Sequence, residues 1–356
     1  AGFRQSGTGD YFGLRSNGYF WTSSEYTGID GYRWFRFLRF SDSDVARNGA
    51  DEPYGFSIRC LSNEIQTGTI LVPDDFATIQ AALNYAIQGD TIFVAAGTYY
   101  ENIIWPETNG IKLIGSSEDD CIIDGGSLAS VIRFEEDLNG IIDSTTFITG
   151  FTIQNGAGAD SGAINTWGGG MRLDSSSPTL TNVTFSGNTA VQFGGGMHLV
   201  SSSPTLIGVT FSNNTASIGG GMHLVSFSNP TLTDVTFSGN SANNGGGMHL
   251  SSSSPTLTGV TFSDNSSYSK GGGIYSGSTY PSSSINGSYV LINNNYSAGH
   301  GAGIFIGAGN NIILNKSTIA SNRVGEGDTF GAGIYADGGT VTLINSIVYY
   351  NRREGD

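Results

Sequence analysis

Three histidines recur at nearly equal spacing in the middle of the chain, and their side chains are the ones best suited to chemistry. His198, His223 and His249 are separated by 25 and 26 residues, and each follows a Gly-Gly-Gly-Met sequence. Neutral imidazoles can hold a transition metal, and they can also bind a sugar or a peptide by stacking and hydrogen bonding. Duplication of a segment would copy the same histidine without any binding role, so a purely structural interpretation stays open.

The position that these histidines occupy continues in both directions along the chain. Arg172 holds it before them, and Tyr275, Phe305 and Tyr335 hold it after them. If each position lies on a strand that pairs with the next copy, the side chains form one column on the outer surface. We assign no catalytic and no metal-ligand residue, and take these as candidate ligand-binding residues: Arg172, His198, His223, His249 and Tyr275.

The column depends on a repeat of about 26 residues. Between Gly168 and Asn265 one pattern occurs four times: Gly-Gly-Gly-Met, a Ser-rich stretch with Pro-Thr-Leu, and Val-Thr-Phe-Ser-x-Asn. The apolar residues alternate in short runs bounded by turn formers, which predicts strands that pair with their copies about 4.8 Å away. The sequence therefore predicts an all-β fold, a right-handed parallel β-helix with three sheets and about ten coils.

The same pattern predicts which side chains fill the interior. Met171, Leu173, Leu180, Val183 and Phe185 should point inward, and the residues between them outward. We also expect the Asn that ends each repeat to form a ladder of stacked amides inside a turn. The Asn residues assigned to this ladder are Asn188, Asn214, Asn240, Asn265, Asn293, Asn322 and Asn351.

The residue composition changes near Asn63, which predicts two domains, residues 1–62 and 63–356. Residues 70–105 should cap the N-terminal end of the β-helix, and residues 150–351 should form its regular coils. In the cap, Phe76, Ile79 and Leu83 have helical spacing after an acidic Asp-Asp pair, which predicts a helix with an acidic first turn. The chain starts with Ala rather than Met, which is typical of a processed product.

Residues 1–62 are rich in aromatic residues and Arg. The segments SNGYFWTSSEY and YGFSIRCL resemble the C-terminal half of the Fibrobacter succinogenes major paralogous domain, a bacterial extracellular module similar to C-type lectins. The resemblance implies a partial lectin-like α+β module that binds glycans through Trp21 and Trp34. A lectin calcium site typically contains Glu-Pro-Asn, and Glu52-Pro53-Tyr54 departs from it at the third position. Packing of the aromatic residues in a core is the alternative.

The second domain carries two resemblances. Residues 72–103 are similar to the start of pectin-lyase-like β-helix proteins, in which a helix closes the open end of the stack. The recurring Phe-x-x-Asn and Gly-Gly-Gly-Met or Gly-Ala-Gly-Ile sequences resemble the repeats of chlamydial polymorphic membrane proteins. That family implies a cell-surface β-helix used in adhesion.

Charge narrows the range of partners. The whole net charge of −15 falls after residue 62, where 8 basic residues stand against 23 acidic ones. Such a surface disfavours nucleic acids and polyuronates, and it is compatible with calcium. We predict no other cofactor, and no apolar run reaches the roughly 20 residues of a membrane span. Four aspartates could supply acid–base chemistry, but the sequence brings no two of them together: Asp124, Asp143, Asp160 and Asp174.

These observations favour a non-enzymatic structural or adhesive protein outside a bacterial cell, with the β-helix as a spacer or binding surface. The expected partners are a carbohydrate or a cell-surface protein. Two alternatives stay open: a pectin-lyase-like polysaccharide lyase or hydrolase, and a fibre subunit that assembles through the open C-terminal end of the stack. The two cysteines, Cys60 and Cys121, can be free or paired.

Overall fold

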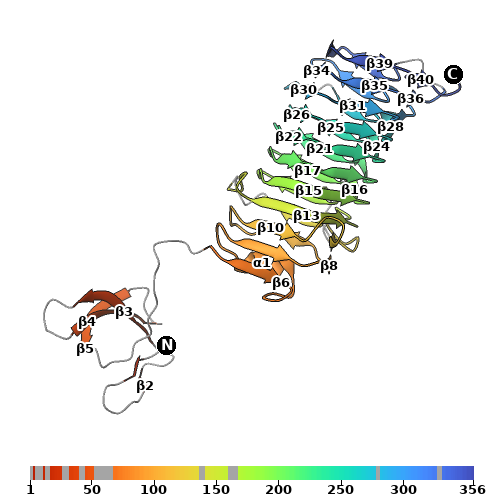
Figure 1. Cartoon of the computed structure of the whole chain (residues 1–356). Helices are drawn as coiled ribbons and strands as arrows, with labels where there is room; N and C mark the ends of the chain where they lie inside the picture. Colours follow the sequence, from red (N-terminus) through yellow and green to blue (C-terminus); the bar gives the residue numbers. More distant parts are fainter. Residues whose placement is uncertain are drawn as a thin grey trace. The chain divides into compact units, whose positions relative to one another are not determined.

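The computed structural model of the chain divides into two compact units, Ala1–Gln66 and Thr67–Asp356 (Figure 1). In the first unit the structure describes only the backbone of the strands. In the second it describes residues 67–135, 141–158, 167–277, 281–326 and 331–356.

The strands of the first unit are all antiparallel. β1 (Phe3–Arg4) pairs with β2 (Tyr11–Phe12), and a three-stranded sheet contains β3 (Asn17–Glu25), β4 (Tyr32–Arg39) and β5 (Val45–Asp51). Two of the aromatic and Arg-rich segments therefore form the strands β3 and β4, as their composition predicts, and the YGFSIRCL segment lies outside the described residues.

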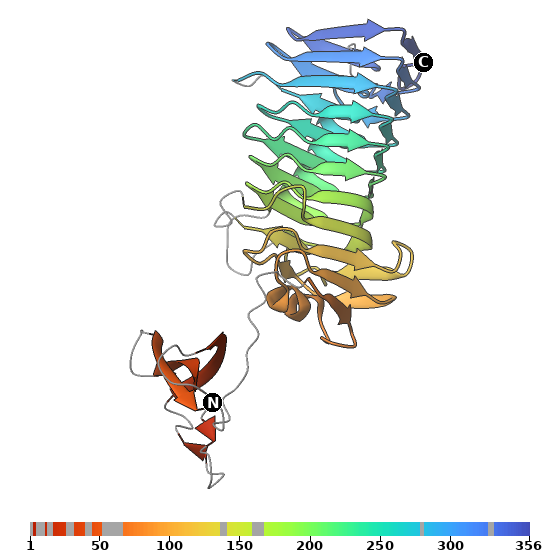
Figure 2. The same ribbon diagram turned by 60° about the vertical axis from the view of Figure 1, so that its left-hand side comes forward.

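The second unit is a parallel β-helix in which each strand pairs with its copy in the next coil (Figure 2). Its described strands form three sheets, and the nine-stranded one indicates nine coils where the sequence suggested about ten. The nine-stranded sheet contains β9 (Ile103–Ile104), β12 (Ile132–Phe134), β14 (Met171–Asp174), β17 (Met197–Val200), β21 (Met222–Val225), β25 (Met248–Leu250), β29 (Ile274–Ser276), β33 (Ile304–Gly307) and β37 (Ile334–Asp337).

The other two sheets complete each coil. The seven-stranded sheet contains β16 (Thr189–Phe193), β20 (Thr215–Ile218), β24 (Ser241–Asn244), β28 (Ser266–Lys270), β32 (Tyr296–Ser297), β36 (Arg323–Val324) and β40 (Arg352–Arg353). The nineteen-stranded sheet contains β6 (Thr69–Val72), β7 (Thr91–Val94), β8 (Gly97–Tyr100), β10 (Lys112–Gly115), β11 (Cys121–Asp124), β13 (Phe147–Gln154), β15 (Thr179–Ser186), β18 (Thr205–Ile207), β19 (Thr210–Ser212), β22 (Thr231–Thr233), β23 (Thr236–Ser238), β26 (Thr256–Thr258), β27 (Thr261–Ser263), β30 (Ser284–Ser288), β31 (Leu291–Asn293), β34 (Asn311–Asn315), β35 (Thr318–Ala320), β38 (Thr340–Ile344) and β39 (Ile347–Tyr349).

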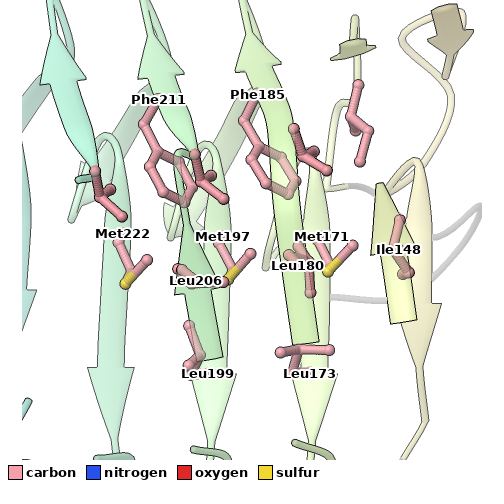
Figure 3. Packing of buried hydrophobic residues seen from close by; sticks show 14 of the residues in the cluster. Ile148, Met171, Leu173, Leu180, Phe185, Met197, Leu199, Leu206, Phe211 and Met222 are labelled. Carbon is pink, nitrogen blue, oxygen red and sulfur yellow. The ribbon is translucent and has the colours of Figure 1, made fainter. Parts of the chain in front are cut away.

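The inward register predicted from the sequence is confirmed. Met171, Leu173, Leu180, Val183 and Phe185 are fully buried, and so are their copies in the next coils (Figure 3). The phenylalanines equivalent to Phe185 stack with ring centroids 4.7 to 4.9 Å apart. Identical side chains in register thus form a continuous core along the stack.

The amide ladder is also confirmed, with one residue corrected. The Nδ2 of Asn188 donates to the Oδ1 of Asn214 at 3.0 Å and to the carbonyl of Ile153 at 2.9 Å. The same bonds continue coil by coil to Asn351. The member after Asn265 is Asn295 rather than Asn293.

Two corners of each regular coil have a positive φ, and in the four coils from β15 to β27 Asn or Asp alternates there with Gly. A Cβ added to Gly208 would lie 2.9 Å from the Oδ1 of Asn182 in the preceding coil, and one added to Gly239 would lie 2.5 Å from the Oδ1 of Asn213. Each Gly therefore leaves room for the side chain beside it. The first corner has Asn182, Gly208, Asp234 and Gly259, and the second has Gly187, Asn213, Gly239 and Asp264.

The helix predicted at the N-terminal end of the stack is α1 (Ile79–Tyr85), which packs on β6, β7 and β9 (Figure 1). Thr78 caps it by accepting a hydrogen bond from the Ala81 amide at 3.2 Å. The expected acidic first turn is wrong, because no acid lies in that turn. The carboxylate of Glu101 instead accepts the first helical amides from a neighbouring loop. No helix among the described residues has the length and apolarity that a membrane crossing requires.

Candidate functional site

The outward column predicted from the sequence exists on the nine-stranded sheet. Strand pairing aligns Arg172 with His198, and the alignment continues through the next five coils to Tyr335. The column also includes Arg133 in β12, which the sequence did not reveal. The Ile-Arg-Phe of β12 has no Gly-Gly-Gly-Met before it, and its only signal is the alternation of apolar and charged residues.

A second column lies beside the first, at the end of the seven-stranded sheet. The ring centroid of Phe193 is 4.8 Å from that of His223, and the centroid of Trp167 is 5.5 Å from that of His198. Farther along, the Nζ of Lys270 lies 4.5 Å from the ring centroid of Phe305. The covering column, in register from coil to coil, contains Trp167, Phe193, Ile218, Asn244, Lys270 and His300.

The covering column corrects the expectation of an accessible histidine strip. His198, His223 and His249 are only 2%, 5% and 9% exposed. The first Gly of each Gly-rich turn leads the chain into the strand that carries the histidine. A Cβ on Gly194 would lie 2.9 Å from the Cα of His198. The glycines thus let the backbone turn tightly against the start of the strand that carries each histidine. These side chains cannot present an open surface to a glycan or peptide.

The imidazoles interact mainly with one another and with aromatic rings. The Nδ1 atoms of His198 and His223 are 2.9 Å apart, and the two ring planes differ by 4°. One Nδ1 must donate and the other accept, so the two rings carry their protons differently. The Nδ1 of His249 is buried and has no hydrogen-bond partner.

Burial determines the charge of these rings. Desolvation lowers the pKa of His198 to about 3, and the nearby Arg172 guanidinium adds to the shift. Desolvation also lowers the pKa of His249 to about 3, and it lowers that of His223 together with repulsion from the neighbouring imidazoles. All three are therefore neutral at pH 7.

The N-terminal end of the column is charged and more open. Arg172, whose side chain is 24% exposed, forms an ion pair with Asp174 at 3.1 Å, and its guanidinium carbon lies 5.2 Å from the ring centroid of Trp167. In the preceding coil, Arg133 pairs with Glu135 at 3.6 Å. A polar ligand could reach these two Arg–carboxylate pairs, and Tyr275 and Tyr335 farther along the column are also partly exposed.

The other described carboxylates singled out in the sequence are hydrogen-bonded to residues of their own turn and of an adjacent coil. Asp124 accepts hydrogen bonds from Gln154, Gly126 and Asn155. Burial alone would raise the pKa of Asp124, but these three bonds outweigh it and the pKa is lowered. The Thr145 hydroxyl and amide, with Asn109, lower the pKa of Asp143. Asp160 lies outside the described residues.

No group of three His, Cys, Asp or Glu side chains that could hold a metal ion occurs among the residues that the structure describes. Cys121 is a free, buried thiol, and burial raises its pKa to about 11. Cys60 lies outside the described part of the chain. Whether the protein takes up calcium stays a prediction.

The tryptophans assigned to a lectin-like site lie on adjacent strands of the first unit. Trp21 in β3 pairs with Phe35, and Trp34 in β4 pairs with Gly49. The Glu52-Pro53-Tyr54 segment lies outside the described residues. The lectin-like assignment and the glycan-binding role of the two tryptophans stay predictions.

Comparison with known proteins agrees with the coil architecture. No curated protein matches the chain. Among solved structures, the chain is similar to the A-module of mannuronan C-5 epimerase AlgE4 from Azotobacter vinelandii, with 15% identity and a TM-score of 0.33. That match covers 80% of this chain and 96% of the epimerase module. Its identity and TM-score are too low to support an inference about activity. A model of the right-handed β-helix region matches residues 92–283. With more than half of its length matched, the chain belongs to the right-handed β-helix family.

Proposed function

We propose that this β-helix is a non-enzymatic structural or adhesive element outside a bacterial cell, with the coil stack acting as a rigid spacer. The observation that carries the proposal is that the repeated side chains face their own copies in the next coil. The phenylalanines, the asparagines and the outward column all make contacts along the stack. Repetition in this chain is thus a device for holding coils together.

The state of the ionisable groups supports the same proposal. Acid–base catalysis needs a group that reaches its substrate and exchanges a proton near the working pH. The three imidazoles are buried and neutral, and Asp124 and Asp143 are held in hydrogen bonds that lower their pKa. The imidazoles therefore lack access to a substrate, and the two aspartates lack the raised pKa that a general acid needs at pH 7.

The alternative of a polysaccharide-active enzyme has one observation in its favour. The Arg133–Glu135 and Arg172–Asp174 rungs lie on paired strands of adjacent coils, and two nearby carboxylates can act as acid and base on a glycosidic bond. If these carboxylates catalyse cleavage, Asp174→Asn should abolish it.

The test is incubation of the full chain with a broad panel of plant, algal and bacterial polysaccharides, with and without calcium. New reducing ends and unsaturated products are measured, and Asp174→Asn and Asp143→Asn serve as matched variants. The scaffold proposal expects no cleavage by any of the three proteins. Cleavage by the parent chain that is lost only in Asp174→Asn would overturn it and identify the charged rungs as a catalytic centre.

A further inference from the structure

The imidazole column contains buried titratable nitrogens that the scaffold role, which needs only stacked rings, does not require. His198, His223 and His249 occupy three successive strands of the nine-stranded sheet, β17, β21 and β25. In the following coils the same position holds Tyr275 and Phe305. The fold therefore accepts an aromatic ring without a titratable nitrogen at this place, and imidazole is not required for packing.

Among the described residues, no carboxylate is paired with the imidazoles of the column. Trp167 and Phe193 cover the rings from the neighbouring sheet, and Tyr275 follows them in the next coil. None of the three imidazoles forms an ion pair within the described part of the chain. The cation Arg172 acts on His198 and lies before it, Lys270 lies over Phe305 beyond the imidazoles, and the carboxylate of Asp174 is already paired with Arg172.

The hydrogen bond between His198 and His223 further disfavours protonation of both rings. Its two Nδ1 atoms are 2.9 Å apart, so one nitrogen must keep a free lone pair. Addition of a proton to both rings would leave two N–H groups facing each other in the interior. Separation of the coils would expose both rings to water and relieve this repulsion.

We propose that this column makes the middle of the rod sensitive to acid. The column holds the coils of β17, β21 and β25 together at neutral pH and allows them to open in mildly acidic surroundings. Coils of a solenoid can open locally because each contacts only its neighbours. The flanking coils, with Arg, Tyr or Phe at this position, stay closed under the same conditions.

The sign and the size of the effect follow from proton linkage. The pKa of each ring is lowered in the folded coil and returns to about 6.5 when the ring meets water. The open form therefore binds more protons below pH 6.5, and stability is lost as the pH falls through that value. At pH 5.5 each imidazole multiplies the opening constant by roughly 10, and the three together by roughly 1000. Ordinary Asp and Glu side chains, with a pKa near 4, remain ionised at that pH.

The test compares hydrogen exchange of the full chain at pH 7.5 and pH 5.5, after correction for the intrinsic exchange rate. In the parent chain the protection of β17, β21 and β25 should fall by roughly 1000-fold, and that of β10 and β34 should change little. A triple variant, His198→Phe with His223→Phe and His249→Phe, should keep its protection at both values.

A single variant keeps the test decisive if the triple variant fails to fold. His249→Tyr copies the residue of the next coil, Tyr275, and the loss of protection should shrink to roughly 100-fold. The proposal is overturned if protection in the parent chain does not fall, if it falls equally in the variants, or if β10 and β34 lose as much as the three central strands.

Discussion

The first coils and the regular coils of this β-helix are stabilised in different ways. In the first coils single polar side chains bind particular backbone groups. Asp90 accepts from the amides of Gly68 and Ile87, and Asn102 donates to carbonyls of the next coil. In the regular coils the same residue recurs, and Asn214 bonds to Asn240 as Asn240 bonds to Asn265.

The two regions thus supply hydrogen bonds to their buried backbone groups in two different ways. A ladder supplies the same bond in every coil, so one repeat solves the problem for all of them. The end of a stack has no copy on one side, and its polar groups need partners supplied one at a time. Loss of a ladder residue should therefore weaken two neighbouring coils, and loss of a polar residue in the first coils should weaken one contact.

The largest effect should come from the phenylalanine stack. We expect Phe211→Ala to lower the free energy of unfolding by about 3–5 kcal/mol, because it removes a fully buried ring between two others. Urea unfolding measures the change. The control is Phe227→Ala, since Phe227 is 65% exposed and its loss should change stability by less than about 0.5 kcal/mol. Equal losses in both variants would show that the inward register is wrong.

The next effect concerns the amide ladder. Asn240→Ala removes a buried amide that donates to Phe211 and Asn265 and accepts from Asn214. Neighbouring polar groups are left without partners, and we expect a loss of roughly 2–4 kcal/mol in urea unfolding. Asn243, an exposed residue of the same coil whose side chain donates to Ser217, provides the control. If Asn243→Ala costs as much as Asn240→Ala, the ladder has no special role.

A smaller effect is expected in the first coils. Glu101→Ala removes the carboxylate that accepts the amides of Ile79 and Gln80 at the start of α1. Loss of such a cap typically costs about 1–2 kcal/mol, and we expect circular dichroism melts to show it. Glu107→Ala, at an exposed site nearby, should leave the melt unchanged. A loss as large as that of Asn240→Ala would remove the distinction between the two regions.

The smallest effect belongs to the charged end of the outward column. Arg172→Gln breaks a partly exposed ion pair with Asp174 and a contact with Trp167. We expect a loss of about 1 kcal/mol in dilute buffer, and less in 1 M salt, because salt screens exposed pairs. Salt-dependent urea unfolding measures it. A loss that salt does not reduce would mean that stacking on Trp167 dominates.

The sequence was sufficient to predict the coil architecture and the inward side chains, because a period of about 26 residues places identical residues on top of one another. It was ambiguous where the repeat degrades. Residues 293–295 are all Asn, and spacing alone pointed to Asn293. Strand pairing instead aligns Asn293 with Ser263, which moves the ladder to Asn295.

The burial of the histidines could not be predicted from the same pattern. The covering column contains Trp167, Phe193, Ile218, Asn244 and Lys270, which share no chemical type, so no repeat marked them as a column. Only the corner geometry, with a Gly beside each imidazole, brings them over the outward rings. A residue that points away from the core can be buried by its own chain, and alternation alone does not distinguish this from exposure.

The alternation of Asn or Asp with Gly at the two corners bears on how such a chain can lengthen. Insertion or loss of a single coil after Asn182 would place two Asn or Asp side chains, or two glycines, in consecutive coils. Insertion of two coils restores the order at both corners. Within these coils the corner pattern therefore repeats every two coils, and engineered variants should tolerate a change in length of two coils there better than a change of one. The later coils, with Tyr289 and Lys316 at the first corner, do not carry this restriction.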